Sequence, residues 1–271
     1  SRGLGDVYKR QALKAGKFNH EKIDVIFHEG ACSDTMEYNG KYMMQNNFEY
    51  TKNLMHFAAD RKIQMIYASS ASTYGSGAHG FTEKPECEEA LNVYAFSKLF
   101  FDNYARRYFG KTGSQLVGLR YFNVYGPQEN HKGKMASMVF QMYNQWKAEG
   151  KVKLFEGIDG YGNGEQTRDF VYAGDIAQAA AKAVALTGYN VINISTGKET
   201  SLNSLLEAFK SACGGHELTV NYVPARSGDI FRSVLSNKKL EALLGFVPQM
   251  DIEHGIPKTY NDYLARRKEG L

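Results

Sequence analysis

Three residues in the first half of the chain could together remove a proton from an alcohol: Ser70, Tyr94 and Lys98. A free phenol loses its proton only near pH 10, so a tyrosine base at neutral pH needs a neighbouring cation. Tyr94 and Lys98 are four residues apart, which places both on one face of a helix, where the lysine could lower the pKa of the tyrosine. The Y-x-x-x-K spacing alone is a weak signal, because exposed pairs of this kind are common on helices.

The neighbouring elements strengthen this interpretation. A buried strand over 64–68 runs into a turn of small residues that holds Ser70, and a helix capped by Asn92 then carries Tyr94 and Lys98. The other predicted elements are strands over 23–28, 115–122 and 191–194, and helices over 41–61 and 202–212. Such alternation predicts an α/β fold with a Rossmann-like, doubly wound parallel sheet.

The alternation breaks after Pro127, which indicates a smaller second part. Its predicted elements are a helix over 136–149, strands over 153–157 and 218–222, a glycine-rich loop over 159–164 and a basic helix over 260–267. We therefore expect a partial dinucleotide-binding domain formed by 12–127 with 170–215. A smaller, interleaved substrate-binding domain would comprise 128–169 with 216–271.

Composition excludes several classes of protein. Of the 271 residues 43% are hydrophobic, but no apolar run approaches the ~18 residues of a membrane span, so we expect a cytoplasmic protein without a membrane partner. Cys32, Cys87 and Cys213 are widely separated, which predicts neither a disulfide framework nor a metal site. The dispersed net charge of +4 argues against a nucleic-acid surface and suits a small anionic substrate.

Several longer segments have a recognisable pattern: FHEGACSDT (27–35), KYMMQNN (41–47), LRYFNVYGP (119–127), HKGKMAS (131–137), KLFEG (153–157) and TRDFVYAGDI (167–176). They resemble the extended short-chain dehydrogenase/reductase family, and within it the ADP-glycero-manno-heptose 6-epimerases. This resemblance covers about residues 12–265. It implies inversion of C6 of an ADP-activated heptose through a transient ketone, in lipopolysaccharide core precursor synthesis. It also implies a bound NADP, with NAD not excluded, and a homo-oligomer.

The start of the chain departs from that family. The first eleven residues, SRGLGDVYKRQ, resemble nothing in it, and no G-x-x-G-x-x-G follows a strand. We expect residues 1–11 to be foreign sequence and the sheet to lack its first strands, so that the strand over 23–28 lies at an edge. The chain would then hold only the nicotinamide half of a cofactor site and could be inactive, and the residues that distinguish NADP from NAD would be missing.

The resemblance also implies a second acid/base. When an alcohol is oxidised and reduced again on its opposite face, the ketone oxygen lies away from Tyr94, so a second proton donor is needed. The lysine that has this role in the family corresponds to Lys132. Without the resemblance, the HKGK run would be interpreted as a solvated charged loop.

The remaining implied site residues bind the cofactor or the substrate. The cofactor set is Glu29, Gly30, Ala31, Cys32, Ser33, Asn46, Lys98 and Val124. The substrate set is Asn123, Lys134, Gln141, Phe155, Glu156, Gly157, Ile158, Arg168 and Arg232. The family often has serine, histidine and tyrosine at Lys134, Gln141 and Arg232, and Arg226 with Arg232 resembles the diphosphate-binding arginines of other nucleotide-sugar epimerases. These departures leave the nucleotide and the sugar open.

Two alternatives remain. One is a UDP-hexose 4-epimerase or another nucleotide-sugar enzyme of the same family. A dehydratase is disfavoured, because Ala71 and Ser72 stand where dehydratases have an Asp-Glu pair. The other alternative is a non-catalytic binding protein on the same scaffold, against which the joint presence of the four proposed catalytic residues argues.

Overall fold

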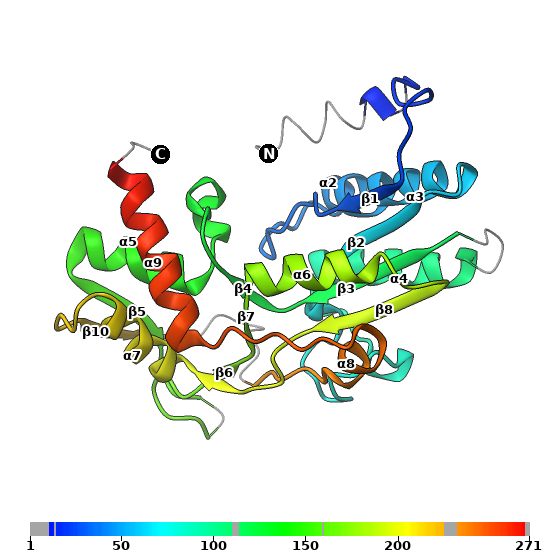
Figure 1. Cartoon of the computed structure of the whole chain (residues 1–271). Coiled ribbons are helices and arrows are strands. Elements are labelled where there is room, and N and C mark those ends of the chain that lie inside the picture. Colours follow the sequence, from blue (N-terminus) through cyan, green and yellow to red (C-terminus); the bar gives the residue numbers. More distant parts are fainter. Residues whose placement is uncertain (1–10, 14, 110–113, 159, 225–231, 269–271) are drawn as a thin grey trace. The chain divides into compact units, whose positions relative to one another are not determined.

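The computed structural model describes residues 11–13, 15–109, 114–158, 160–224 and 232–268. The chain divides into two compact units (Figure 1). The first comprises Ser1–His79, Glu83–Tyr121 and Ala180–Asn193, and the second comprises Gly80–Thr82, Phe122–Ala179 and Ile194–Leu271. No helix within the described ranges is long and apolar enough to cross a membrane.

A four-stranded sheet with the order β1-β2-β3-β8 forms the centre of the first unit. The strands are β1 (Val25–His28), β2 (Gln64–Ser70), β3 (Leu116–Tyr121) and β8 (Tyr189–Ile194). The first three are parallel, and Ile66 lies between Phe27 and Val117 in the register. Ile66 and Val117 are fully buried, as expected where both faces of a parallel sheet are covered. The predicted α/β fold with a parallel sheet is confirmed.

Strand β1 has one neighbour, β2, among the described residues. Its Phe27 is 48% exposed, which is high for a large apolar side chain on a strand. The predictions for residues 1–11 fall outside the described residues except at Gln11.

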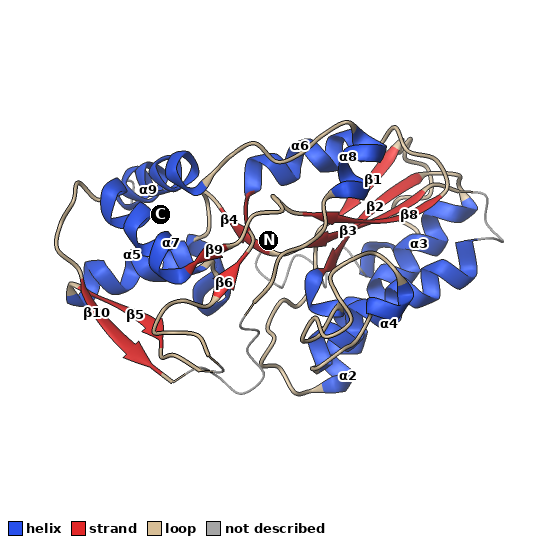
Figure 2. Ribbon diagram, turned by 90° about the horizontal axis from the view of Figure 1, so that it is seen from below, coloured by secondary structure: helices blue, strands red, loops and turns tan. Residues whose placement is uncertain are grey.

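Two helical segments lie side by side along one face of this sheet (Figure 2). One is α4 (Val93–Phe109). The other is a continuous run of α2 (Gly40–Met43), the π-helical turn η1 (Met44–Glu49) and α3 (Tyr50–Asp60). The sequence predicted a regular helix over 41–61, and the π-helical turn is the difference. Such wider turns often occur at functional sites.

Among its described residues, the second unit contains three two-stranded sheets. They pair β5 (Lys151–Phe155) with β10 (Thr219–Val223), β4 (Asn123–Tyr125) with β7 (Phe170–Tyr172), and β6 (Thr167–Arg168) with β9 (Thr200–Ser201). The first two pairs are parallel and the third is antiparallel. Helix α6 (Ala173–Ala183) follows β7 and is divided between the two units.

Helices α5 (Met138–Glu149), α7 (Leu202–Ala212) and α9 (Ile252–Lys268) share the apolar core of the second unit, and α8 (Lys238–Leu244) lies before α9 in the chain. The sequence places 202–212 in the dinucleotide-binding domain, whereas the buried Leu205 and Phe209 of α7 pack in this second core. Helix α9 begins at Ile252, earlier than predicted, and contains Pro257.

Candidate active site

Ser70 and Tyr94 meet where β2 ends and α4 begins. Ser70 is the last residue of β2, and its Oγ accepts hydrogen bonds from the backbone N (3.2 Å) and the Oγ (2.9 Å) of Ser72. The side chain of Asn92 accepts from the backbone N of Ala95 (2.8 Å), which confirms the predicted cap of α4. The side chain of Ser70 lies close enough to that of Tyr94 to act on the Tyr94 pKa. The structure therefore brings these two predicted residues together.

The environment of Tyr94 differs from the prediction. Burial raises the pKa of Tyr94 above its ordinary value, and the hydrogen bond with Ser70 opposes this rise. The Tyr94 pKa is thus raised, whereas the sequence predicts that Lys98 lowers it. Nζ of Lys98 donates to the backbone O of Ala68 at 2.8 Å.

Lys98 is itself buried, and this changes its acidity. Burial lowers the pKa of Lys98 from 10.5 to about 8, while the charges of Asp102, Glu29 and Cys32 oppose that lowering. Lys98 is therefore mostly a cation at neutral pH, but it releases its proton far more readily than an exposed lysine. A lysine of this kind next to a tyrosine can take part in proton transfer.

One buried amide ties the loop after β1 to α4. Asn47, 1% exposed, accepts from the backbone N of Cys32 (2.8 Å) and donates to the backbone O of Cys32 (3.0 Å). It also donates to Oγ of Ser97 (2.9 Å), which in turn donates to the backbone O of Tyr94 (2.7 Å). Asn47 thus fixes the predicted cofactor-binding segment next to the proposed base.

Asn47 is not among the predicted cofactor residues, whereas its neighbour Asn46 is. Asn46 lies in the same π-helical turn, but its Nδ2 donates to the backbone O of Tyr42 (2.8 Å) in its own helix. The Asn-Asn pair was the available signal, and a regular helical pattern could not indicate which of the two faces inward. Of the other predicted cofactor residues, Glu29 accepts a hydrogen bond from Oη of Tyr121 (3.0 Å).

Lys132 lies in the second unit, in the short 3-10 segment η4 (Asn130–Met135). Its Nζ is 3.4 Å from Oε1 of Glu129, a carboxylate that is only 3% exposed. Glu129 also accepts from the backbone N (3.0 Å) and Oγ (2.5 Å) of Ser137 and from Oη of Tyr263 (2.9 Å). Ser137 and Tyr263 therefore fix the Glu129 carboxylate that pairs with Lys132. Because Tyr94 belongs to the other unit, the pairing of the two acid/bases stays a prediction.

Two predicted substrate residues lie at the same segment as Lys132: one belongs to η4 and the other forms a hydrogen bond to it. Lys134 belongs to η4, and Nε2 of Gln141 on α5 donates to the backbone O of Gly133 (2.9 Å). Gly133 has a φ of 56°, a conformation that L side chains rarely adopt. The glycine between the two lysines thus allows the tight bend of this segment.

Arg168 on β6 is nearly buried, at 9% exposure. The carboxylate of the next residue, Asp169, accepts from the backbone N (2.9 Å) and Oγ1 (2.7 Å) of Thr196 and from the backbone N of Gly197 (2.9 Å). Burial raises the pKa of Asp169. Nδ2 of Asn123 on β4 donates to the backbone O of Asp169 (3.4 Å), so Asn123 lies close to the residue that follows Arg168.

The segment Phe155 to Ile158 follows β5 in the same unit. Nε2 of Gln166 donates to the backbone O of Glu156 (2.6 Å), and the backbone N of Gly157 donates to Oδ1 of Asn163 (2.7 Å). Ile158 is 43% exposed. These bonds fix the backbone and leave the Ile158 side chain accessible.

Arg232 is exposed and forms an ion pair with Glu199, with Nε donating to Oε1 at 2.8 Å. Hydrogen bonding to Arg232 lowers the pKa of Glu199. Val124 lies on β4, between Asn123 and Tyr125. Arg226 falls outside the described residues.

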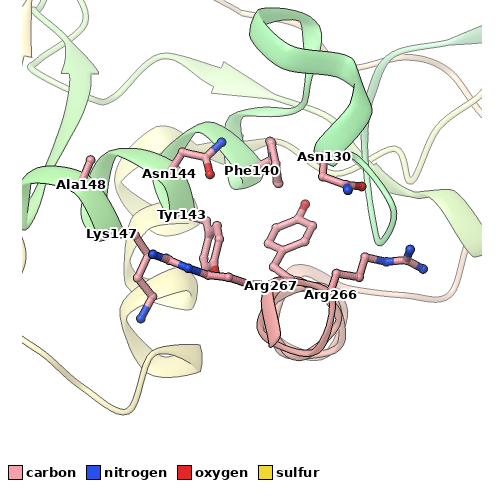
Figure 3. A pocket seen from close by; sticks show the side chains of 9 residues that line it. Asn130, Phe140, Tyr143, Asn144, Lys147, Ala148, Arg266 and Arg267 are labelled. Atoms are coloured by element: carbon pink, nitrogen blue, oxygen red, sulfur yellow. The ribbon is translucent and has the colours of Figure 1, made fainter. Parts of the chain in front are cut away.

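A cavity of about 340 Å³ lies among η4, α5 and α9 (Figure 3). Lys147, Arg266 and Arg267 give it a basic lining, but it contains none of the predicted substrate residues. Arg266 is paired with Asp262 at 2.8 Å. Basic residues in the last turn of α9 also suit the negative end of the helix dipole. The basic residues of the cavity are therefore explained by this ion pair and by the helix dipole.

Comparison with known proteins identifies the family. The NAD dependent epimerase/dehydratase family matches residues 5–195. The chain belongs to this family. A family member from Thiobacillus denitrificans, named ADP-L-glycero-D-manno-heptose-6-epimerase, is 50% identical over 253 residues, covering 92% of this chain and 72% of that protein. A protein of the same name from Brachyspira hyodysenteriae is 43% identical, covering 92% of this chain and 78% of the relative.

Solved structures of epimerases agree in fold. The crystal structure of Helicobacter pylori ADP-L-glycero-D-manno-heptose-6-epimerase has a TM-score of 0.81 and 33% identity, covering 94% of this chain and 76% of that one. Thermus thermophilus UDP-glucose 4-epimerase in complex with NAD also has a TM-score of 0.81, with 26% identity, covering 96% of this chain and 83% of that one. The chain therefore has the Rossmann-like fold of these epimerases.

Proposed function

We propose that this chain inverts C6 of an ADP-activated heptose by transient oxidation to a ketone. The observation that carries this proposal is the 50% identity, over 92% of the chain, to a relative named for that reaction. The assembled Ser70, Tyr94 and Lys98 support it, because oxidation of an alcohol needs a group that accepts the hydroxyl proton.

The proposed cofactor is NADP, with NAD as the alternative. When bound, it supplies the acceptor and the donor of the hydride at C6. The residues fit such a group: the backbone of Cys32 is fixed and a buried cation is present at the carboxyl ends of β1 and β2, where ligands bind in open α/β sheets. The proposed binding residues are Glu29, Gly30, Ala31, Cys32, Ser33, Asn46, Lys98 and Val124.

In the first half of the reaction, Ser70 orients the C6 hydroxyl and Tyr94 takes its proton. Burial raises the pKa of Tyr94, so the phenolate needs a cation nearby. Lys98 is the cation within reach on the same helix, and we propose that its ammonium turns from the carbonyl of Ala68 toward Tyr94 during the reaction. The lysine would then stabilise the phenolate directly.

In the second half, Lys132 gives a proton to the ketone oxygen on the opposite side of the sugar. The buried carboxylate of Glu129 would position its ammonium. Arg168 is proposed to bind the diphosphate, because a guanidinium forms paired hydrogen bonds with phosphate oxygens. The other proposed substrate residues are Asn123, Lys134, Gln141, Phe155, Glu156, Gly157, Ile158 and Arg232.

The assay offers each C6 epimer of ADP-heptose to the purified chain at millimolar NADP or NAD, so that weak cofactor binding does not hide turnover. We expect each epimer to give the same final mixture, and UDP-hexoses offered in parallel to stay unchanged. Turnover of UDP-hexose alone would identify a 4-epimerase. Cofactor binding without turnover of either substrate would identify a binding protein.

We further propose that the reaction serves lipopolysaccharide core precursor synthesis in the cytoplasm and that the protein acts as a homo-oligomer. The heptose epimerase relatives support this context. Sedimentation equilibrium tests the oligomer, and a mass equal to that of one 30.4 kDa chain at micromolar concentration would contradict it.

A further inference from the structure

A buried cluster of charges lies on α4, next to the proposed catalytic residues. Asp102 on α4 and Arg120 on β3 are both fully buried. Oδ2 of Asp102 accepts from Nη2 (2.8 Å) and Nε (3.2 Å) of Arg120 and from Oγ of Ser69 (2.8 Å). Oδ1 accepts from Oη of Tyr67 (2.9 Å). One carboxylate is therefore held by side chains from two strands.

Arg120 is held from its other side as well. Its Nη2 donates to Oε1 of Glu88 (2.6 Å), which also accepts from Nη2 of Arg106 (2.6 Å), and its guanidinium lies 4.8 Å from the ring centre of Tyr74. A buried ion pair often stabilises a core no more than apolar side chains of similar volume would. Stability alone therefore explains this arrangement poorly, and its position relative to the catalytic residues suggests a second role.

Asp102 and Lys98 lie on the same face of α4, one turn apart. The two residues also contact consecutive positions of β2. Lys98 donates to the backbone O of Ala68, and Asp102 accepts from the side chains of Tyr67 and Ser69. Lys98 and Arg120 are thus two buried cations next to one fully buried carboxylate. Among the charges that oppose the effect of burial on the pKa of Lys98, Asp102 is the largest.

We propose that Asp102 is a positioning residue, whose carboxylate, fixed by Arg120 and two β2 side chains, keeps the ammonium of Lys98 charged at the reaction site. This inference rests on the proposed function for its catalytic meaning. Other titratable groups also face Lys98, namely Glu29, Cys32 and His28. Burial lowers the pKa of His28 to about 3, so it is neutral at working pH. Glu29 directly follows β1, and burial raises its pKa; its charge opposes the lowering of the Lys98 pKa less than that of Asp102 does.

The direct test is the titration of Lys98 in the 271-residue chain by lysine-selective ¹³C NMR, without cofactor or substrate. Asp102→Asn keeps the shape and removes the charge, so we expect the pKa of Lys98 to fall by about one unit or more. Glu88→Gln is the matched control, because it removes a carboxylate from the same arginine but should leave the Lys98 pKa unchanged. An unchanged Lys98 pKa in Asp102→Asn, or an equal fall in both variants, overturns the inference.

Loss of the buried charge could prevent folding of Asp102→Asn. Tyr67→Phe then decides the question with the carboxylate in place. Removing one donor leaves more of the carboxylate charge uncompensated, so the pKa of Lys98 should rise. A constant or lower pKa of Lys98 in this variant speaks against the proposal.

Activity provides a separate readout. In Asp102→Asn the alkaline limb of the kcat/KM profile should move to lower pH by the same amount as the Lys98 titration, whereas the limb should not move in Glu88→Gln. A limb that stays in place while Lys98 shifts contradicts the positioning role. Absence of epimerase activity in the unsubstituted chain would refute the proposed function, and the NMR titration would still decide whether Asp102 controls the charge of Lys98.

Discussion

Asn47→Ala tests whether one buried amide holds the cofactor-binding segment on α4. The substitution removes an acceptor from the backbone N of Cys32 and a donor from Oγ of Ser97. A buried group left without a partner costs about 1–3 kcal/mol, and each further lost hydrogen bond costs about 1 kcal/mol. We therefore expect the free energy of unfolding to fall by about 2–4 kcal/mol, measured by urea denaturation followed by circular dichroism.

Asn46→Ala is the matched control, because it changes the same residue type at the adjacent position. Its side chain donates to a backbone oxygen of its own helix on the exposed side, so we expect a loss below about 0.5 kcal/mol. As a proposed cofactor residue, Asn46 should instead affect NADP affinity. Equal losses of stability in the two variants, or a loss below about 1 kcal/mol in Asn47→Ala, would refute the interpretation.

Three further predictions concern the proposed catalytic residues. Tyr94→Phe should lower kcat about 100-fold or more while cofactor affinity stays near normal, as measured by steady-state kinetics and titration calorimetry; near-normal kcat would exclude Tyr94 as the base. Lys132→Met should lower kcat similarly from either heptose epimer, and unchanged rates from both would remove Lys132 from the mechanism. Because folding lowers the pKa of Lys98 from 10.5 to about 8, the unfolded chain binds more protons between these pH values. The stability of the unsubstituted chain relative to Lys98→Met should therefore rise by about 3 kcal/mol from pH 7 to 10.5, and a flat difference in urea denaturation would contradict the Lys98 pKa.

Local spacing explains why much of the first unit could be predicted. The position of Asn92 before an apolar helix predicted a cap, and the structure shows its bond to Ala95. The spacing of Tyr94 and Lys98 placed them on one helix, and the small-residue turn placed Ser70 at the end of a strand. These predictions depend on neighbours within a few residues, for which backbone geometry is nearly fixed.

Contacts between distant segments could not be predicted in this way. The π-helical turn shifts the inward face by a fraction of a turn, so regular periodicity could not select Asn47 over Asn46. The bond from Lys98 to Ala68 depends on how α4 packs on β2, which local spacing does not determine. An amphipathic pattern likewise predicted that α7 has a buried face, but not which of two cores receives it.

The most direct test of the central claim is epimerisation in D₂O. A single C6 epimer of ADP-heptose is incubated with the chain and millimolar NADP, and the product is analysed by ¹H NMR and mass spectrometry. Transient oxidation at C6 returns the same hydrogen to carbon, so the account predicts the opposite epimer with hydrogen retained at C6. Deuterium at C6 would indicate proton removal from carbon, and it would contradict both the proposed ketone and the roles assigned to Tyr94 and Lys132.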